Sequence, residues 1–273
     1  MPSKNPALRG LGGAAGGQQN AGWGATPQYG APGQYGAPTQ DAYSAPSPYA
    51  ATTTRYLTMD DVVTKTGLSF LVTVVAAALV WAAPGQAAWG LALPAVLVAF
   101  VLGLVIAFKQ IASPIATLSY GALYGVALGA ISEAFNDVYP GIVVQALLGT
   151  FGVFGGMLVV YKTGAVRVTP KFTRWLMGAM IGALVLMVAN FVAYFFMDDG
   201  LGLRTDGPLG ILFSLVVIGI AAFSLLLDFD MADEAIRRGA PAKFAWYIAF
   251  GLLVTVVWLY IEILRLLSYL QND

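Results

Sequence analysis

Five polar residues of this sequence lie within long apolar stretches and are its main candidates for chemistry: Glu133, Asn190, Asp228, Thr255 and Glu262. An ionised carboxylate costs several kcal/mol in an apolar environment, so acids in such positions commonly serve in ion or proton transfer. Oxygen ligands suit protons and Ca²⁺. We therefore expect these five residues to line an ion pathway or to act as a pH sensor.

The side chains that the sequence lacks exclude most catalysis. It contains no Cys and no His, which removes thiolate nucleophiles, imidazole bases and the preferred ligands of zinc. A serine nucleophile would have no histidine base. We expect no enzyme and no cofactor apart from Ca²⁺ as a transported ion, and the sequence leaves open whether oxygen ligands hold a metal. Fourteen basic residues balance fourteen acidic ones, which argues against a nucleic-acid partner.

The elements that position these residues are predicted to be transmembrane helices. Hydrophobic residues make up 58% of the chain and charged residues 10%, a composition that rules out a single soluble domain. Apolar runs of about 20 residues, the length that crosses a bilayer, occur near residues 62–83, 87–108, 115–135, 141–161, 175–196, 208–229 and 244–268. The sequence therefore predicts an all-α integral membrane protein with seven transmembrane helices, and a lipid bilayer as its surroundings.

The N-terminal segment differs from the rest of the chain. Residues 1–57 are rich in Gly, Pro and Tyr and contain the repeated sequence QYGAP, so they offer no core that could offset the entropy of ordering. We predict a disordered tail at 1–57 and a transmembrane domain at 58–273.

Basic residues between the helices predict the orientation. With the N-terminus inside, twelve of the fourteen Lys and Arg residues fall on the cytoplasmic side, and Arg204 and Arg265 fall outside. Because cytoplasmic connections of membrane proteins are enriched in Lys and Arg, we expect a multi-pass protein of the plasma membrane with a cytoplasmic N-terminus and an extracytoplasmic C-terminus.

The acids are predicted to form two zones. The rise of 1.5 Å per residue places Glu133 and Glu262 towards the outer side, with Asn190 at a similar depth, and Asp228 towards the inner side. Glu262 could instead pair with Arg265 one turn along its own helix. Asp230, Asp233 and Glu234 are expected to be a solvated start of the following loop.

Small residues predict close helix packing. Gly121, Gly125 and Gly129 recur every four residues, and Gly178 and Gly182 repeat that spacing. Such spacing lets helices approach closely in lipid.

Several segments resemble the Bax inhibitor-1/YccA family, also called the transmembrane Bax-inhibitor-motif family, in its bacterial branch with a Gly/Pro-rich tail. They are LTMDDVVTKTG at 57–67, YPGIVVQALLGTFGVFG at 139–155, YKTGAVRVTPKFTR at 161–174, GPLGILFSLVVIGIAAFSLLLDFD at 207–230 and GAPAKFAWYIAFGLLVTVVWLYIEILRLL at 239–267. The resemblance covers about 58–270. It implies a seven-helix bundle with the last helix central, and a pH-sensitive Ca²⁺ leak gated by a carboxylate pair between helices six and seven.

The resemblance places the helix-six acid at Asp228 and leaves two alternatives for its partner on helix seven. Aligning the motif around Leu259 and Tyr260 makes Glu262 the partner, whereas aligning the terminal run puts Thr255 there. The predicted depths of Asp228 and Glu262 disagree with a direct bond between them.

Two functions are therefore expected. The first is a Ca²⁺ leak channel modulated by pH through intramembrane carboxylates. The alternative is a non-transporting regulator that binds other membrane proteins, such as a membrane protease, through its flexible tail.

Overall fold

The structure is a computed structural model that describes residues 55–82, 87–197 and 199–271. Most of the predicted tail, residues 1–54, lies outside the described residues. Within the described ranges there are seven α-helices, each long and apolar enough to cross a membrane, which confirms the predicted fold class. They are α1 (Met59–Trp81), α2 (Ala87–Lys109), α3 (Pro114–Val138), α4 (Ile142–Thr163), α5 (Pro170–Ala193), α6 (Pro208–Arg237) and α7 (Ala245–Gln271), with the short 3₁₀ helix η2 (Ala242–Phe244) before α7.

Helix starts follow local capping chemistry. The hydroxyls of Thr58 and Thr169 accept the backbone N–H of Asp61 and Phe172 at the starts of α1 and α5, satisfying donors that the first turn leaves free. A proline opens each of α3, α5 and α6, where the missing N–H costs nothing.

Helix α6 is longer than predicted. The expected end near residue 229 was wrong, because α6 continues to Arg237. Its C-cap is followed by Gly239, whose φ is +66°. Arg237 and Arg238 each form an ion pair with Glu234 one turn earlier. The end of the apolar run marks where hydrophobic burial stops, while these charge pairs support further helical turns. Asp230, Asp233 and Glu234 therefore lie on the helix and not in a loop.

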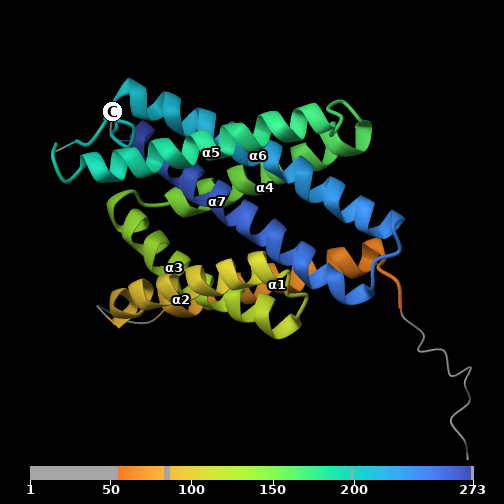
Figure 1. The fold of residues 1–273 in the computed structure, drawn as a ribbon. Coiled ribbons are helices and arrows are strands. Elements are labelled where there is room, and N and C mark those ends of the chain that lie inside the picture. The colour runs from red at the N-terminus through yellow and green to blue at the C-terminus, as the bar shows by residue number, and fades with distance from the viewer. Residues whose placement is uncertain (1–54, 83–86, 198, 272–273) are drawn as a thin grey trace, which may run out of the picture. The chain divides into compact units, whose positions relative to one another are not determined.

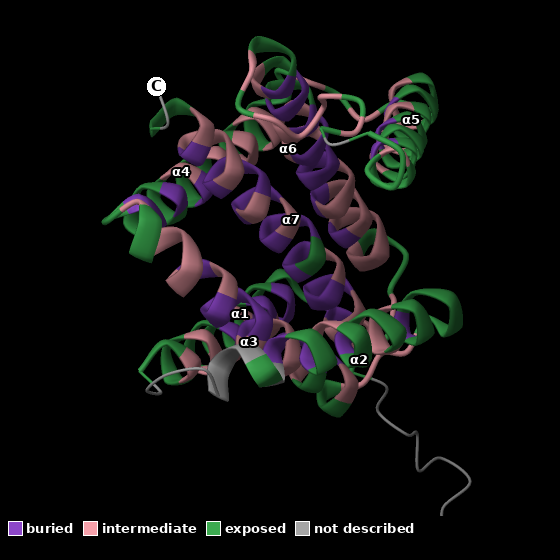
Figure 2. Ribbon diagram, turned by 90° about the vertical axis from the view of Figure 1, so that its left-hand side faces the viewer, coloured by how far each residue is buried: buried purple, intermediate pink, exposed green. Residues whose placement is uncertain are grey.

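Helix α7 is the central element, as expected. It packs against α1, α3, α4 and α6, and 72% of its membrane-spanning window is buried, compared with 17% for α5. Figure 1 shows α7 crossing between α1 and α3 on one side and α4 and α6 on the other. In Figure 2 its ribbon is mostly coloured as buried, whereas α5 is largely exposed.

The glycines of α3 allow close packing against α1. A Cβ at Gly125 would collide with the backbone oxygen of Thr73, and one at Gly129 would lie 2.5 Å from the backbone oxygen of Ala77. The prediction that the glycines of α5 allow close helix packing was wrong. A Cβ at Gly178 or Gly182 would meet no described atom of this chain within 4 Å. Helix α5 packs on α6 through Phe172, Leu176 and other larger side chains, so its small residues face away from this contact.

The helices alternate in direction, which gives the bundle two ends. We call the end with the starts of α1 and α7 the basic end, because Lys65, Lys162, Arg167, Arg237 and Lys243 lie there. We call the other the opposite end. At the basic end, residues 55–57 pair with the connection between α6 and α7: Leu57 N–H donates to Ala240 O, and Ala242 N–H donates to Arg55 O, both at 2.8 Å.

Candidate functional site in the α6–α7 interface

Asp228 on α6 faces Thr255 on α7. The Thr255 hydroxyl lies 2.7 Å from Asp228 Oδ2 and also approaches the backbone oxygen of Gly251 at 3.2 Å. Thr255 is 9% exposed, and Asp228 is half-buried. A Cβ added to Gly251 would lie 3.6 Å from Asp228 Oδ1, an ordinary van der Waals distance, so the carboxylate lies close to the α7 backbone at this residue.

The surroundings of this pair are apolar. Leu225, Leu226 and Phe229 on α6 and Leu252 and Val256 on α7 are all buried. Within the described ranges, none of the ion pairs includes Asp228. The hydrogen-bond partner of this carboxylate is thus a neutral hydroxyl, which leaves a negative charge without a fixed counter-ion when the acid is ionised.

Glu262 lies elsewhere, in a different electrostatic setting. It is seven residues after Thr255 on α7, about 10 Å along the axis. Its side chain accepts from Arg204 at 3.2 Å and from Arg265 at 3.0 Å, and only 2% of the residue is exposed. Of the two alternatives for the partner of Asp228, the structure has Thr255 in that position.

The ion pair between Glu262 and Arg265 agrees with the alternative prediction that Glu262 pairs with a cation on its own helix. The second cation at Glu262, Arg204, was not predicted from the sequence. Arg204 lies in the connection between α5 and α6 and reaches back to α7. Its only signal in the sequence is that it is a lone basic residue among Asp198, Asp199 and Asp206.

Asn190 and Glu133 do not join these groups through any described hydrogen bond. The Asn190 side chain, which is buried, accepts the backbone N–H of Leu201 at 3.0 Å and of Leu203 at 3.4 Å. It therefore fastens the connection between α5 and α6. Glu133 Oε2 on α3 is buried and has no hydrogen-bond partner in the described part of the chain.

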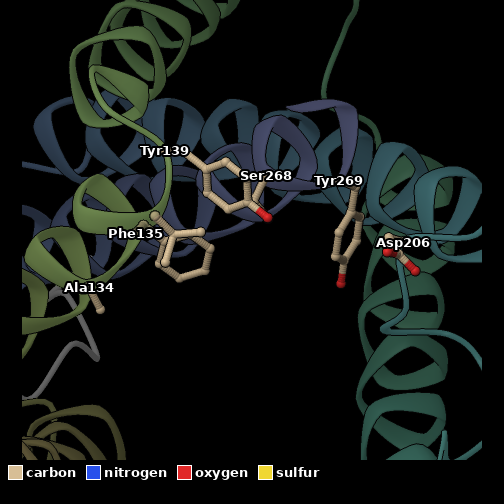
Figure 3. Close-up of a pocket in the computed structure, with 7 residues that line it drawn as sticks. Ala134, Phe135, Tyr139, Asp206, Ser268 and Tyr269 are labelled. Carbon is tan, nitrogen blue, oxygen red and sulfur yellow. The ribbon is translucent and has the colours of Figure 1, made fainter. Parts of the chain in front are cut away.

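A cavity of about 450 Å³ opens at the opposite end, and its lining includes Ala134, the residue after Glu133, but not Glu133 itself. Figure 3 shows Ala134, Phe135 and Tyr139 on one side of it and Tyr269 and Asp206 on the other, with Ser268 between them. One carboxylate and a few hydroxyls are too few to hold Ca²⁺, which takes six to eight oxygens. No group of three or more acidic side chains suited to a metal ion occurs among the described residues.

A third polar cluster, not predicted from the sequence, connects the helices at the basic end. Asp61 on α1 is buried and pairs with Arg55 at 3.0 Å and Lys65 at 3.5 Å. The Lys65 ammonium also donates to the backbone oxygen of Ala242 at 2.7 Å and lies 5.8 Å from the ring centre of Trp246. This cluster fixes the start of α1 to the start of α7, so Asp61 is fully neutralised and unsuited to capture a mobile cation.

The chain was compared with known families and proteins. A family model described as Bax inhibitor 1 like matches residues 12–272. No match was found among curated protein sequences.

Proposed function

This chain belongs to the Bax inhibitor 1 like family and is a polytopic membrane protein; from that premise we propose that it forms a leak pathway for Ca²⁺ that Asp228 controls. The pathway would follow α7, which contacts four other helices. The single observation that carries the proposal is the contact between the Asp228 carboxylate and the neutral Thr255 hydroxyl inside the bundle.

The contrast with the other buried acids supports this role. Glu262 is held by two guanidinium groups, and Asp61 by a guanidinium and an ammonium group. Their negative charges are already compensated, so they have little attraction left for a passing cation. Asp228 has no such partner. Because its surroundings are apolar and have a low dielectric constant, the attraction between its ionised carboxylate and a cation is stronger than it would be in water.

The small number of oxygen ligands favours passage over storage. Asp228, Thr255 and the backbone oxygen of Gly251 provide four oxygens at most, which is below the usual Ca²⁺ coordination number. A conducting site must bind an ion well enough to admit it and weakly enough to release it. An incomplete ligand set of this kind is suited to brief occupation.

The same contact offers a route to modulation by pH. A proton on Asp228 would cancel the charge that attracts the cation. The protonated carboxyl could then donate its O–H to the Thr255 hydroxyl oxygen, while Thr255 donates to the backbone oxygen of Gly251, which it already approaches at 3.2 Å. Protonation would thus lower cation affinity without leaving a polar atom unpaired.

The location and orientation are part of the proposal. The basic end carries most of the Lys and Arg residues of the described helices and connections, and such ends usually face the cytoplasm. We place the protein in the plasma membrane with its basic end inside and the end of α7 outside. Ca²⁺ would then move along α7, between the end of the bundle that carries Glu262 and the depth at which Asp228 lies.

Ca²⁺ entry into vesicles tests the proposal. The full-length chain is reconstituted in proteoliposomes containing a Ca²⁺ indicator, and the initial rate is compared with that of empty vesicles. We expect Asp228→Asn to lower this rate about tenfold, equivalent to ~1.4 kcal/mol of lost cation stabilisation. Glu234→Gln is the matched control, because it removes an exposed acid from the same helix. Equal rates in empty and protein-containing vesicles at acidic and neutral pH would refute the leak.

The alternative, a non-transporting regulator that binds a membrane protein, has one supporting observation. Residues 55–57 pair with the connection between α6 and α7, so a partner held by the tail would act next to the helices that carry Asp228 and Thr255. Deletion of residues 1–54 leaves that pairing intact. Loss of a co-purifying membrane protein on this deletion, together with absent flux in the full chain, would favour the regulator.

A further inference from the structure

A cavity of about 790 Å³ lies at the basic end, and its lining includes neither Asp228 nor Thr255. It is bounded by α1, the end of α4, the connection after α4, and α6. Its volume is in the range of sites that bind small organic ligands. Its apolar walls include Val62, Val63, Phe70, Phe154, Leu158, Phe229 and Leu252.

Charges of both signs line this cavity. Lys162 and Arg167 are exposed, and neither forms an ion pair with a described residue. Asp230 and Asp233 line it from α6, and Asp233 accepts the Tyr161 hydroxyl at 2.8 Å. Two cations and two carboxylates therefore border one cavity without neutralising one another.

A buried hydroxyl in the same lining lacks a partner. Thr66 on α1 is 7% exposed, and its Oγ1 makes no hydrogen bond within the described part of the chain. The neighbouring Ser69 and Thr73 instead donate to backbone oxygens one turn earlier. A buried polar group without a hydrogen-bond partner costs free energy. A ligand atom in the cavity that forms a hydrogen bond with the Thr66 hydroxyl would remove this cost.

The apolar part of the lining continues away from the charged end. Phe70 and Phe154 meet edge to face with centroids 6.4 Å apart, and beyond them lies a cavity of about 220 Å³ that also includes Phe70. Its hydroxyls are satisfied: Thr150 donates to Ala146 O, and Ser132 pairs with Tyr260. This second cavity therefore presents a hydrocarbon surface.

We infer that the two cavities hold a zwitterionic aminophospholipid, phosphatidylethanolamine. Its phosphate lies near Lys162 and Arg167, its primary ammonium lies near Asp230 and Asp233, and an acyl chain runs past Phe70 into the second cavity. A free phosphate or a purely anionic headgroup would place a further negative charge beside Asp230 and Asp233, whose neighbouring cation Arg237 is already paired with Glu234. A quaternary ammonium could not donate hydrogen bonds to these two carboxylates, which selects the primary amine.

Native mass spectrometry of the full-length, delipidated protein tests this inference. Equimolar phosphatidylethanolamine, phosphatidylcholine and phosphatidylglycerol are offered together, and we expect phosphatidylethanolamine to be retained about five-fold or more over each competitor, in line with charge-assisted hydrogen bonds. Equal retention of the three, or preference for phosphatidylglycerol in the unaltered chain, would overturn the inference.

A blocking variant tests the position of the site. Gly67 lines the larger cavity, and a Cβ there would meet no atom within 4 Å. Gly67→Leu therefore adds a larger side chain to the lining of the cavity with no clash at its Cβ, and leucine is also the better helix former. We expect it to reduce lipid retention about tenfold, a change of ~1.4 kcal/mol. Gly178→Leu on α5, equally open but outside the cavity, should retain lipid normally. Undiminished retention in Gly67→Leu would contradict the assignment.

Charge variants test the headgroup. Lys162→Gln with Arg167→Gln should weaken retention of phosphatidylethanolamine, whereas Lys171→Gln with Arg174→Gln, at the same end but outside the lining, should not. Asp230→Asn should shift the preference towards phosphatidylglycerol, because a carboxylate that repels anionic lipid is lost. Equal effects of the two basic pairs would show general surface attraction and overturn the specific site.

Discussion

Thr255 donates its hydroxyl to Asp228 at 2.7 Å across the interface of α6 and α7, so this half-buried acid faces a neutral partner. The family resemblance implies a carboxylate pair at this interface. Here one carboxylate is present and the second position holds a threonine. The contact is therefore not a proton shared between two acids, and under the proposed function its control of ion passage would depend on the charge of Asp228 alone.

Replacing Thr255 by valine keeps the shape of the side chain and removes the donor. We expect Thr255→Val to destabilise the protein by about 1–3 kcal/mol, the cost of leaving a buried acceptor unsatisfied, measured as thermal or denaturant unfolding in detergent. Under the proposed function, Ca²⁺ flux should fall, because the ionised carboxylate loses the donor that stabilises it and the cation loses one oxygen ligand. Thr255→Ser retains the hydroxyl and should remain near wild type. Equal stability of the valine and serine variants would contradict the importance of the bond.

Thr255→Asp would create the paired acids that the family resemblance implies. Two carboxylates at hydrogen-bond distance share one proton and repel each other when both are ionised. We expect the Ca²⁺ flux of this variant to rise more steeply with pH than that of the wild type, because loss of the shared proton adds a second negative charge. The measurement is the initial flux in proteoliposomes at each pH. Superimposable pH profiles of variant and wild type would argue against control by this interface.

The Glu262 ion pairs should be structural. Replacing both Arg204 and Arg265 by glutamine leaves a buried carboxylate without its cations, and we expect a loss of about 3–5 kcal/mol in the free energy of unfolding. Glu234→Gln breaks the exposed pairs with Arg237 and Arg238 and should cost at most about 1 kcal/mol. Denaturant titration in detergent gives both values. Similar losses in the two cases would show that burial of Glu262 does not govern its energetics.

Close packing of α1 and α3 depends on Gly125. Its Cβ in an alanine variant would overlap the Thr73 backbone oxygen and lie 2.8 Å from Ala76 Cβ. We expect Gly125→Ala to cost about 1–3 kcal/mol because the backbones must separate. Gly178→Ala meets no atom within 4 Å and should gain up to about 1 kcal/mol from helix propensity. Thermal unfolding of the two variants should therefore shift in opposite directions; a stabilised Gly125→Ala variant would rule out the tight contact.

Asn190 should hold the connection between α5 and α6 and should not conduct ions. Asn190→Ala removes the acceptor of two backbone N–H groups, and we expect it to cost about 1–3 kcal/mol. Asn136→Ala, which removes an exposed bond to Gly141 N–H, should cost less. Hydrogen exchange at residues 199–205 should quicken in Asn190→Ala only. A change in Ca²⁺ selectivity, with exchange unaltered, would instead place Asn190 on the pathway.

The sequence by itself determined the class and architecture of the protein. Long apolar runs must form helices in a membrane, because each backbone polar group there needs an internal partner. The absence of Cys and His limited the chemistry to oxygen groups. Asp228 could be singled out because an acid that directly follows an apolar run is conspicuous in a single sequence.

Only the tertiary structure decided which groups meet. Periodicity places a residue on a face of its own helix but gives no axial register between helices, so Thr255 and Glu262 remained alternatives until α6 and α7 were set side by side. Arg204 reaches Glu262 from a connection 58 residues away, a contact that no local pattern encodes. The same holds for the two cavities that include Phe70, whose walls come from separate helices. Contacts of this kind depend on how whole helices are shifted and rotated against each other, and that is fixed by packing across the bundle.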